Sequence, residues 1–190
     1  MPTVTFMRHA KTTLNEEGKF AGRSDCDITP EGLKKAQEFS DYKLEDFDYY
    51  YCSPLKRTKQ TLEAVIPGAE PIIDERIIER YLGDWEDKPY DTLSDAIIES
   101  YIKGYYNPPN SESYASVKKR VCDFMEEIFE KYKPEDRILV VSHAGVIRQI
   151  RDSFLPNMPK GKISNASTLV VTDVNYKEYL DNKEKEEESR

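Results

Sequence analysis

The amino-acid sequence predicts an α/β fold, a three-layer α/β/α arrangement with a largely parallel central sheet. Apolar runs typical of strands alternate along the chain with segments of helical periodicity, and this order favours parallel strands joined by helical crossovers. One run, Ile138–Val141, is continuously apolar, which is typical of a central strand buried on both faces. The chain has 190 residues, enough for one substantial core, so we expect a single domain over residues 1–176.

Five segments are predicted to form the sheet. Thr3–Met7 alternates between polar and apolar residues, and Tyr49–Cys52 is a short aromatic run. The others are apolar or β-branched. The predicted strands are Thr3–Met7, Tyr49–Cys52, Pro71–Ile73, Ile138–Val141 and Thr168–Val174.

Helix-start signals lie between these strands. Thr29 before Pro30 indicates an N-cap followed by proline at the first helical position, and Ser53 before Pro54 repeats the signal. A third segment carries apolar residues at helical spacing and ends before Pro134. The predicted helices are Leu33–Tyr42, Leu55–Val65, Ser113–Tyr132 and one that begins at Ala144 and Gly145.

Two segments stand outside this alternation. Tyr101–Tyr114 is rich in Pro, Asn, Ser and Tyr, which favours a functional loop. Lys177–Arg190 holds six acidic and four basic residues and almost no apolar ones, so we expect a solvated, frayed tail.

Composition excludes several classes of function. The net charge of −8 argues against broad binding to nucleic acid or an anionic membrane, because both rely on a contiguous basic face. The three cysteines, Cys26, Cys52 and Cys122, are widely spaced and form no CxxC pair, so neither a disulfide framework nor a thiolate metal site is indicated. The chain has only two histidines, which excludes a metal site of three imidazoles.

We expect the chain to have neither a signal peptide nor a membrane span. Charged residues come too early for the apolar region of a signal peptide, and no stretch approaches the roughly 20 apolar residues of a membrane span. We therefore expect a soluble, cytoplasmic protein with reduced cysteines and with neither a membrane nor a nucleic-acid partner.

Both histidines follow predicted strands. His9 comes after Thr3–Met7, and His143 comes after the strand that ends at Val141. Because ligands of α/β sheets bind outside the carboxyl ends of the strands, one rim could hold both. A single histidine in such a place is more often a hydrogen-bonded structural residue, but chance placement of both at equivalent strand ends is a weaker explanation.

Cationic groups are expected at the same rim. Arg8 precedes His9, Arg57 lies about one turn into a helix that follows a strand, and Ala144 opens a helix whose free N–H groups face the rim. Guanidinium groups match phosphate oxygens. The sequence therefore predicts a site for a dianionic tetrahedral group, and the implied small-molecule partner is a phosphate ester.

Five motifs in order carry a family resemblance: Arg8-His9-Ala10-Lys11-Thr12-Thr13-Leu14-Asn15; Phe20–Asp25 with Ile28–Gly32; Ser53–Thr61; Glu79 with Gly83-Asp84-Trp85-Glu86; and Ser142–Arg148. They resemble the histidine phosphatase superfamily, also called the phosphoglycerate mutase-like family, over most of residues 3–174. The first is similar to its Arg-His-Gly-Glu-Thr-x-x-Asn signature, and the third matches Ser-x-x-x-Arg-x-x-x-Thr. The resemblance implies a phosphoglycerate mutase-like fold and a metal-independent phosphomonoesterase that acts on a small phosphorylated metabolite without a cofactor.

The resemblance also implies roles for particular residues. His9 is the expected nucleophile, which forms a phosphohistidine that water hydrolyses. Glu79 is the expected acid for the leaving alkoxide and then the base for water, with Asp84 and Glu86 as local alternatives. The expected groups around the phosphoryl oxygens are His143, Arg8 and Arg57, with substrate contacts from Asn15, Gly22, Arg23 and the N–H of Ala144.

Some residues depart from the family pattern. Ala10 stands for Gly and Lys11 for Glu, and we expect both to affect substrate preference more than phosphoryl transfer. Asn110-Ser111-Glu112-Ser113 resembles a Gly-Gly-Glu-Ser loop with both glycines replaced, and a helix N-cap by one of its serines explains part of it.

Three functions remain as alternatives at this point: the phosphatase, a cofactor-dependent phosphoglycerate mutase, and a non-catalytic phosphate-binding module. The acidic run after Leu82-Gly83 argues against the mutase, and the presence of both histidines with both arginines argues against a binding module. Trp85 and Tyr90 could stack on a sugar or base, or pack within a lid. The sequence selects neither a substrate nor an oligomeric state.

Overall fold

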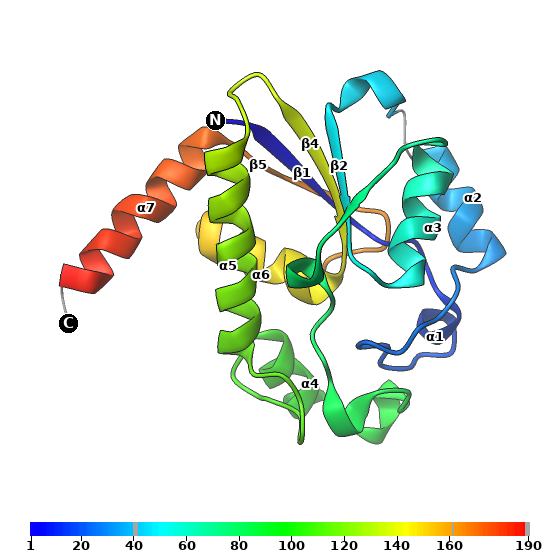
Figure 1. The fold of residues 1–190 in the computed structure, drawn as a ribbon. Helices are drawn as coiled ribbons and strands as arrows, with labels where there is room; N and C mark the ends of the chain where they lie inside the picture. The colour runs from blue at the N-terminus through cyan, green and yellow to red at the C-terminus, as the bar shows by residue number, and fades with distance from the viewer. Residues whose placement is uncertain (40–41, 161, 189–190) are drawn as a thin grey trace.

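The computed structural model describes residues 1–39, 42–160 and 162–188. A five-stranded sheet in the order β3-β2-β4-β1-β5 runs through its centre (Figure 1). The strands are β1 (Thr3–Arg8), β2 (Tyr49–Cys52), β3 (Ile72–Ile73), β4 (Arg137–Ser142) and β5 (Thr168–Val171). Neighbouring strands are parallel except for β5, which pairs antiparallel with β1. The predicted α/β fold with a largely parallel sheet is confirmed.

The register of the two central strands sets the position of the site. β1 and β4 pair in parallel from Thr3 opposite Arg137 to Arg8 opposite Ser142, so both end at the same level. Ile138, Leu139, Val140 and Val141 are fully buried, because β4 lies between β1 and β2 and is covered on both faces. This burial explains the continuous apolar run in the sequence.

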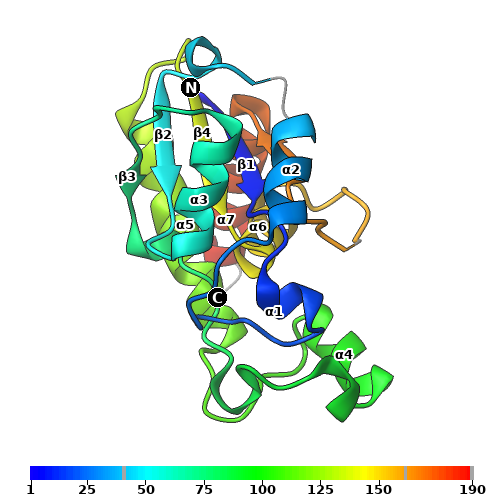
Figure 2. The same cartoon turned by 90° about the vertical axis from the view of Figure 1, so that its right-hand side faces the viewer.

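Helices cover both faces of the sheet (Figure 2). On one face, α2 (Pro30–Phe39) and α3 (Lys56–Val65) pack through Ala36 and Leu62 onto Leu139 and Val141. On the other face lie α5 (Tyr114–Lys131), α6 (Ala144–Phe154) and α7 (Asp173–Glu188). The side chains of β4 alternate between these two cores, which makes the molecule the predicted three-layer structure.

The helix-start signals are mostly confirmed. The Thr29 hydroxyl accepts the Gly32 N–H at 2.9 Å, and Ser113 caps α5 by accepting the Ser116 N–H. The helix predicted to begin at Leu55 begins one residue later, because Leu55 is itself the extended N-cap residue. The predicted helix over 33–42 starts earlier, at Pro30, and its residues 40 and 41 lie outside the described residues.

A separate layer lies beyond the carboxyl ends of the strands. It contains α1 (Thr13–Glu16), α4 (Asp95–Ile102) and 3-10 turns at Gly83–Trp85 and Tyr90–Thr92; two further 3-10 turns are Leu44–Asp46 and Glu75–Ile77. Its small apolar cluster, named here the cover cluster, is built from Phe20, Leu82, Trp85, Leu93, Ile97, Ile98, Tyr101 and Tyr106. The sequence did not predict α4. Of the predicted loop 101–114, the first two residues belong to α4 and the last belongs to α5.

The end of the chain differs most from expectation. The strand predicted through Val174 stops at Val171, and the side chain of Asn175 accepts the Thr172 N–H at the start of α7. Residues 177–188 are helical rather than frayed, because Tyr176 and Tyr179 stack on the core near Phe154 and anchor the first turns. Residues 189 and 190 of the predicted tail lie outside the described residues. None of the helices in the described ranges is long and apolar enough to cross a membrane.

Candidate active site

The two histidines face each other at the ends of β1 and β4. His9 follows Arg8, the last residue of β1, and its N–H donates to the carbonyl of Ser142, the last residue of β4, at 2.9 Å. His143 comes next after Ser142. The imidazole centroids are 5.3 Å apart, and both residues are almost completely buried. The equal length of the paired strands therefore brings together the residues that the sequence predicted at one rim.

The tautomer of His9 follows from its hydrogen bond. Nδ1 lies 2.7 Å from the carbonyl oxygen of Ala10. Because a carbonyl oxygen only accepts, Nδ1 carries the proton and Nε2 keeps its lone pair. Burial, followed by the charges of Arg57 and Arg8, holds the pKa of His9 well below its usual value. His9 is therefore a neutral imidazole with a nucleophilic Nε2.

Arg57 is completely buried in the first turn of α3. Its two terminal nitrogens donate to the carbonyls of Gly22, at 2.6 Å, and Ser24, at 2.9 Å. Its Nε is buried with no hydrogen-bond partner in the described part of the chain. The contacts with residues 22 and 24 hold the guanidinium in place while one donor stays available.

Arg8 has a similar arrangement. One terminal nitrogen donates to the carbonyl of Ile163 at 2.5 Å, and its Nε is buried without a partner among the described residues. Burial lowers the pKa of the Arg8 guanidinium, and the Glu79 carboxylate acts in the opposite direction. Glu79 is thus close enough to Arg8 for their charges to interact.

His143 is oriented by a serine that the site prediction did not include. Its Nε2 lies 2.7 Å from the hydroxyl of Ser53, the residue that follows β2, and its Nδ1 is buried without a partner in the described ranges. Burial, followed by the charges of Arg57, His9 and Arg8, holds the pKa of His143 well below its usual value. The place of Ser53 directly after a strand, as the first residue of the motif that carries Arg57, was a signal that could have identified it.

Unpartnered atoms of this kind are unusual, because buried polar atoms nearly always have hydrogen-bond partners. Arg8, Arg57 and His143 contribute three of the four such atoms in the described chain. Ala144 adds the N-terminal end of α6, where backbone N–H groups lack intrahelical partners. These groups can bind the oxygens of a tetrahedral anion next to His9.

Glu79 lies against the same helix end. Its Oε1 accepts the N–H of Arg80 at 2.8 Å, and its Oε2 accepts the N–H of Gly145 at 3.2 Å. The two alternative acids have other partners: Asp84 accepts from the Asn110 side chain, and Glu86 accepts the N–H groups of Arg23 and Leu82. Of the three carboxylates, the structure brings Glu79 to the α6 terminus.

The remaining predicted residues differ in their contacts. The Asn15 side-chain oxygen accepts from the side chain of Asn165 at 3.2 Å, and the same Asn165 nitrogen donates to the His9 carbonyl at 3.0 Å. Gly22 supplies the carbonyl that holds Arg57. Arg23 donates from Nε to the Glu79 carbonyl at 3.0 Å. Asn15 therefore borders the histidine site, while Gly22 and Arg23 support its neighbours.

The two departures from the family pattern are also resolved. Ala10 is buried, and its N–H donates to the Thr61 hydroxyl at 2.9 Å. Lys11 forms ion pairs with Glu16 at 3.1 Å and Glu31 at 2.9 Å. These contacts hold the ammonium of Lys11 against α1 and α2. Within the described ranges, no group of three His, Cys, Asp or Glu residues is arranged to hold a metal ion.

The model of the histidine phosphatase superfamily (branch 1) matches residues 4–184. The chain belongs to this superfamily. The predicted family and the predicted enzyme class, a phosphoric monoester hydrolase, are confirmed.

Relatives of this histidine phosphatase carry two kinds of name. A metal-independent phosphoserine phosphatase from Arabidopsis thaliana is 30% identical over 179 residues, covering 88% of this chain and 75% of the relative. Phosphoglycerate mutase-like protein 4 from the same plant is 31% identical over 179 residues, covering 88% and 77%. The fold is similar to that of a phosphoserine phosphatase mutant from Entamoeba histolytica in complex with phosphoserine, with a TM-score of 0.74 over 90% of both chains and 24% identity.

Proposed function

We propose that this histidine phosphatase hydrolyses a small phosphate monoester through a phosphohistidine on Nε2 of His9, without a metal ion. The observation that carries the proposal is the free lone pair of Nε2 beside the unpartnered Nε atoms of Arg8 and Arg57 and the unpartnered Nδ1 of His143, which donates when the Ser53 hydroxyl donates to Nε2. Those donors match a phosphoryl group, whose charge they stabilise during transfer.

In the first step, Nε2 of His9 attacks phosphorus, the P–N bond forms and the P–O ester bond breaks. Arg8, Arg57 and His143 hold the equatorial oxygens, with the N–H of Ala144 and the side chain of Asn15 as further donors. Protonated Glu79 gives its proton to the leaving alkoxide, which departs as the alcohol.

In the second step, Glu79 takes a proton from water, and the water oxygen attacks phosphorus. The P–N bond breaks, inorganic phosphate leaves and His9 returns to the neutral state. A site in which buried groups bind a compact dianion favours a small ester over an extended polyanion. The relatives named phosphoserine phosphatase make O-phosphoserine the first substrate to test.

The proposal is tested with His9→Ala and Glu79→Gln. We expect His9→Ala to abolish phosphate release from an aryl phosphate and from O-phosphoserine, with an unchanged circular dichroism spectrum. Rapid quenching of Glu79→Gln should trap an acid-labile, base-stable phosphoprotein that the double variant with His9→Ala does not form. Lys119→Met, which removes one exposed ion pair on α5, is the control and should keep its turnover within about twofold. Unchanged turnover in His9→Ala would refute the mechanism.

Metal independence has its own test. Activity should survive prolonged chelation, and complete loss that a divalent cation restores would contradict this part of the proposal.

Some relatives are named phosphoglycerate mutase or mutase-like, so mutase activity is the second candidate to test. Supplying phosphoglycerate with bisphosphoglycerate separates the two, because a mutase isomerises faster than it releases phosphate. We expect phosphate release to dominate.

A further inference from the structure

The arginines of the described ranges fall into two groups. Five form an ion pair with a carboxylate within 4.0 Å: Arg23, Arg76, Arg120, Arg137 and Arg151. Four do not: Arg8, Arg57, Arg80 and Arg148. Arg8 and Arg57 face the phosphoryl site, so Arg80 and Arg148 need a separate explanation.

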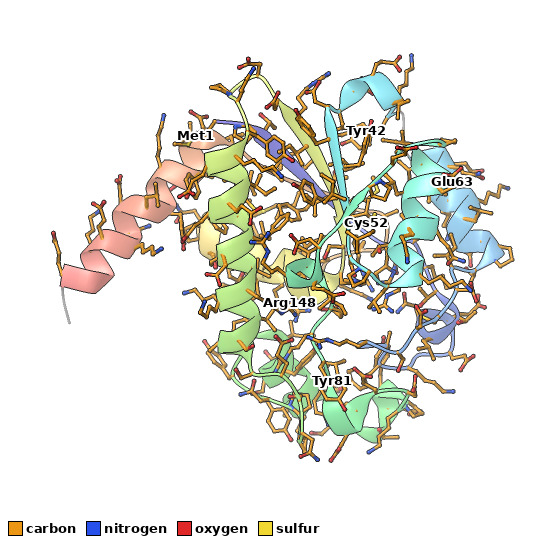
Figure 3. All side chains as sticks on the ribbon, in the orientation of Figure 1. Met1, Tyr42, Cys52, Glu63, Tyr81 and Arg148 are labelled. Atoms are coloured by element: carbon orange, nitrogen blue, oxygen red, sulfur yellow. The ribbon has the colours of Figure 1, made fainter. Side chains whose placement is uncertain are left out.

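Arg80 and Arg148 meet at one ring. Their guanidinium carbons lie 5.3 and 5.8 Å from the centroid of Tyr101, at the end of α4 in the cover cluster. In the view of Figure 3, Arg148 lies between Cys52, at the end of β2, and Tyr81, in the segment below the sheet. Arg148 lies three residues after Gly145 on α6, the helix whose first turn contacts Glu79. Its charge acts on Arg8 at the phosphoryl site, and its guanidinium lies over Tyr101 of the cover cluster.

The two arginines differ in how their donors are used. Arg80 donates from Nε to the Glu112 carbonyl at 2.8 Å and from a terminal nitrogen to the Asn107 side chain at 2.5 Å. Arg148 interacts with the ring and the hydroxyl of Tyr101. Burial raises the pKa of that hydroxyl, which therefore stays a neutral donor. Since a guanidinium has five N–H donors, Arg148 keeps capacity for an anion.

The charges around Arg148 point the same way. Its positive charge acts on the guanidinium of Arg8 and on that of Arg80. Because these like charges repel one another, a carboxylate beside Arg148 would be stabilised there.

We propose that Arg148, together with the Tyr101 hydroxyl, forms a subsite for a carboxylate on the leaving alcohol, so that the enzyme selects phosphate monoesters whose alcohol carries a carboxylate close to the ester carbon. The proposal rests on the proposed function and adds the residues that determine specificity. Arg148 acts on the non-reacting part of the substrate, and the transfer of the phosphoryl group does not involve it.

The test compares O-phosphoserine with O-phosphoethanolamine, which differ only in the carboxylate. We expect the wild type to prefer O-phosphoserine by at least about 10-fold in kcat/KM, since a hydrogen bond to a charged group is worth about 10- to 100-fold. Arg148→Met should remove this preference by lowering kcat/KM for O-phosphoserine, while O-phosphoethanolamine and an aryl phosphate change less than about threefold. Tyr101→Phe should lower the preference in part. Arg137→Met, at the opposite end of β4, is the matched control and should keep it.

Two outcomes overturn the subsite: a wild type without the preference, or an Arg148→Met variant whose activity falls equally on both esters. If Arg148→Met does not fold, the preference measured in Tyr101→Phe and Arg148→Lys decides, and an unchanged ratio in both refutes the proposal. Failure of the proposed function is distinguishable, because the wild type would then release no phosphate even from the aryl ester.

Discussion

The carboxylate of Glu79 lies directly against Gly145, in the first turn of α6. The Gly145 N–H donates to one carboxylate oxygen at 3.2 Å, and a Cβ placed on Gly145 would come within 2.3 Å of the other. Position 145 therefore has to lack a side chain for the acid to reach the helix end that borders the phosphoryl site.

Gly145→Ala is expected to displace Glu79 without unfolding the protein, because alanine is the better helix former. Loss of a positioned proton donor should lower kcat by about 10²- to 10³-fold. Steady-state kinetics with O-phosphoserine measure this. In a Glu79→Gln background the same substitution should have little further effect on kcat, since both substitutions remove the same function, proton donation by Glu79. An unaltered kcat in the single variant would contradict the role of this contact.

Stability should depend on pH through the two histidines. Both have pKa values far below the usual 6.5, because of burial and then neighbouring cations. Between about pH 6.5 and 5 the unfolded chain binds protons that the folded chain does not, so the free energy of unfolding falls as the pH falls. Each histidine contributes up to about 1.4 kcal/mol per pH unit in that window, and above it the contribution is constant.

Chemical denaturation at pH 7.5, 6 and 5 measures this dependence. His9→Asn should retain about half of the slope, because only His143 then contributes. A flat profile in the wild type would show that the folded histidines titrate normally.

Arg57→Lys is expected to lower kcat/KM by about 10²- to 10³-fold even though the charge is kept. A lysine cannot bridge the carbonyls of Gly22 and Ser24 and also direct a third donor to the substrate. Thermal unfolding should shift downwards by a few degrees. The matched control is Arg137→Lys, at an exposed position, which should change neither quantity measurably.

Glu112 joins two arginines that hold the segment before Glu79. It accepts two hydrogen bonds from Arg120 at 2.8 and 3.0 Å and one from Arg23 at 3.0 Å. Although burial acts in the opposite direction, the bonds from Arg120 lower the pKa of Glu112. Arg120 donates in turn to the carbonyls of Arg76 and Ile78, and Arg23 donates to that of Glu79.

Glu112→Gln is therefore expected to destabilise the protein by about 1–3 kcal/mol and to lower kcat. Urea denaturation and turnover of O-phosphoserine check both effects. The control is Asp123→Asn, which removes an exposed ion pair between Asp123 and Lys119 of α5. It should lower the free energy of unfolding by less than about 0.5 kcal/mol. Equal losses in the two variants would argue against a special role for Glu112.

The parts of the fold that could be predicted from the sequence are those with a strong local signal. The apolar run of β4 and the capping serine before α5 locate two elements almost to the residue. Helix α4 was missed because it has no fully buried residue, and its Ile97, Ile98 and Tyr101 are only partly buried against the cover cluster. Helix α7 was missed because its second half is charged, which is typical of a solvated tail. Two tyrosines in its first turns anchor it to the core.

The site likewise has residues that could be predicted from the sequence and contacts that could not. His9, Arg8, Arg57 and His143 follow from strand ends and motif spacing, because the backbone alone brings them together. Contacts between segments distant in sequence could not be predicted, such as the Ser53 bond to His143 over 90 positions or the approach of Glu79 to Gly145 over 66. These depend on how side chains from separate loops pack.

The cover cluster contains Trp85, the only tryptophan of the chain, stacked on Tyr106 with ring centroids 5.5 Å apart. The body of the sheet contains tyrosine and phenylalanine instead. Excitation near the red edge of the indole absorption band therefore gives fluorescence that comes from the cover cluster alone. Its emission can follow ligand entry in real time, and a denaturation curve recorded by indole fluorescence, set beside one recorded by circular dichroism, reveals whether the layer above the histidines melts before the sheet beneath it.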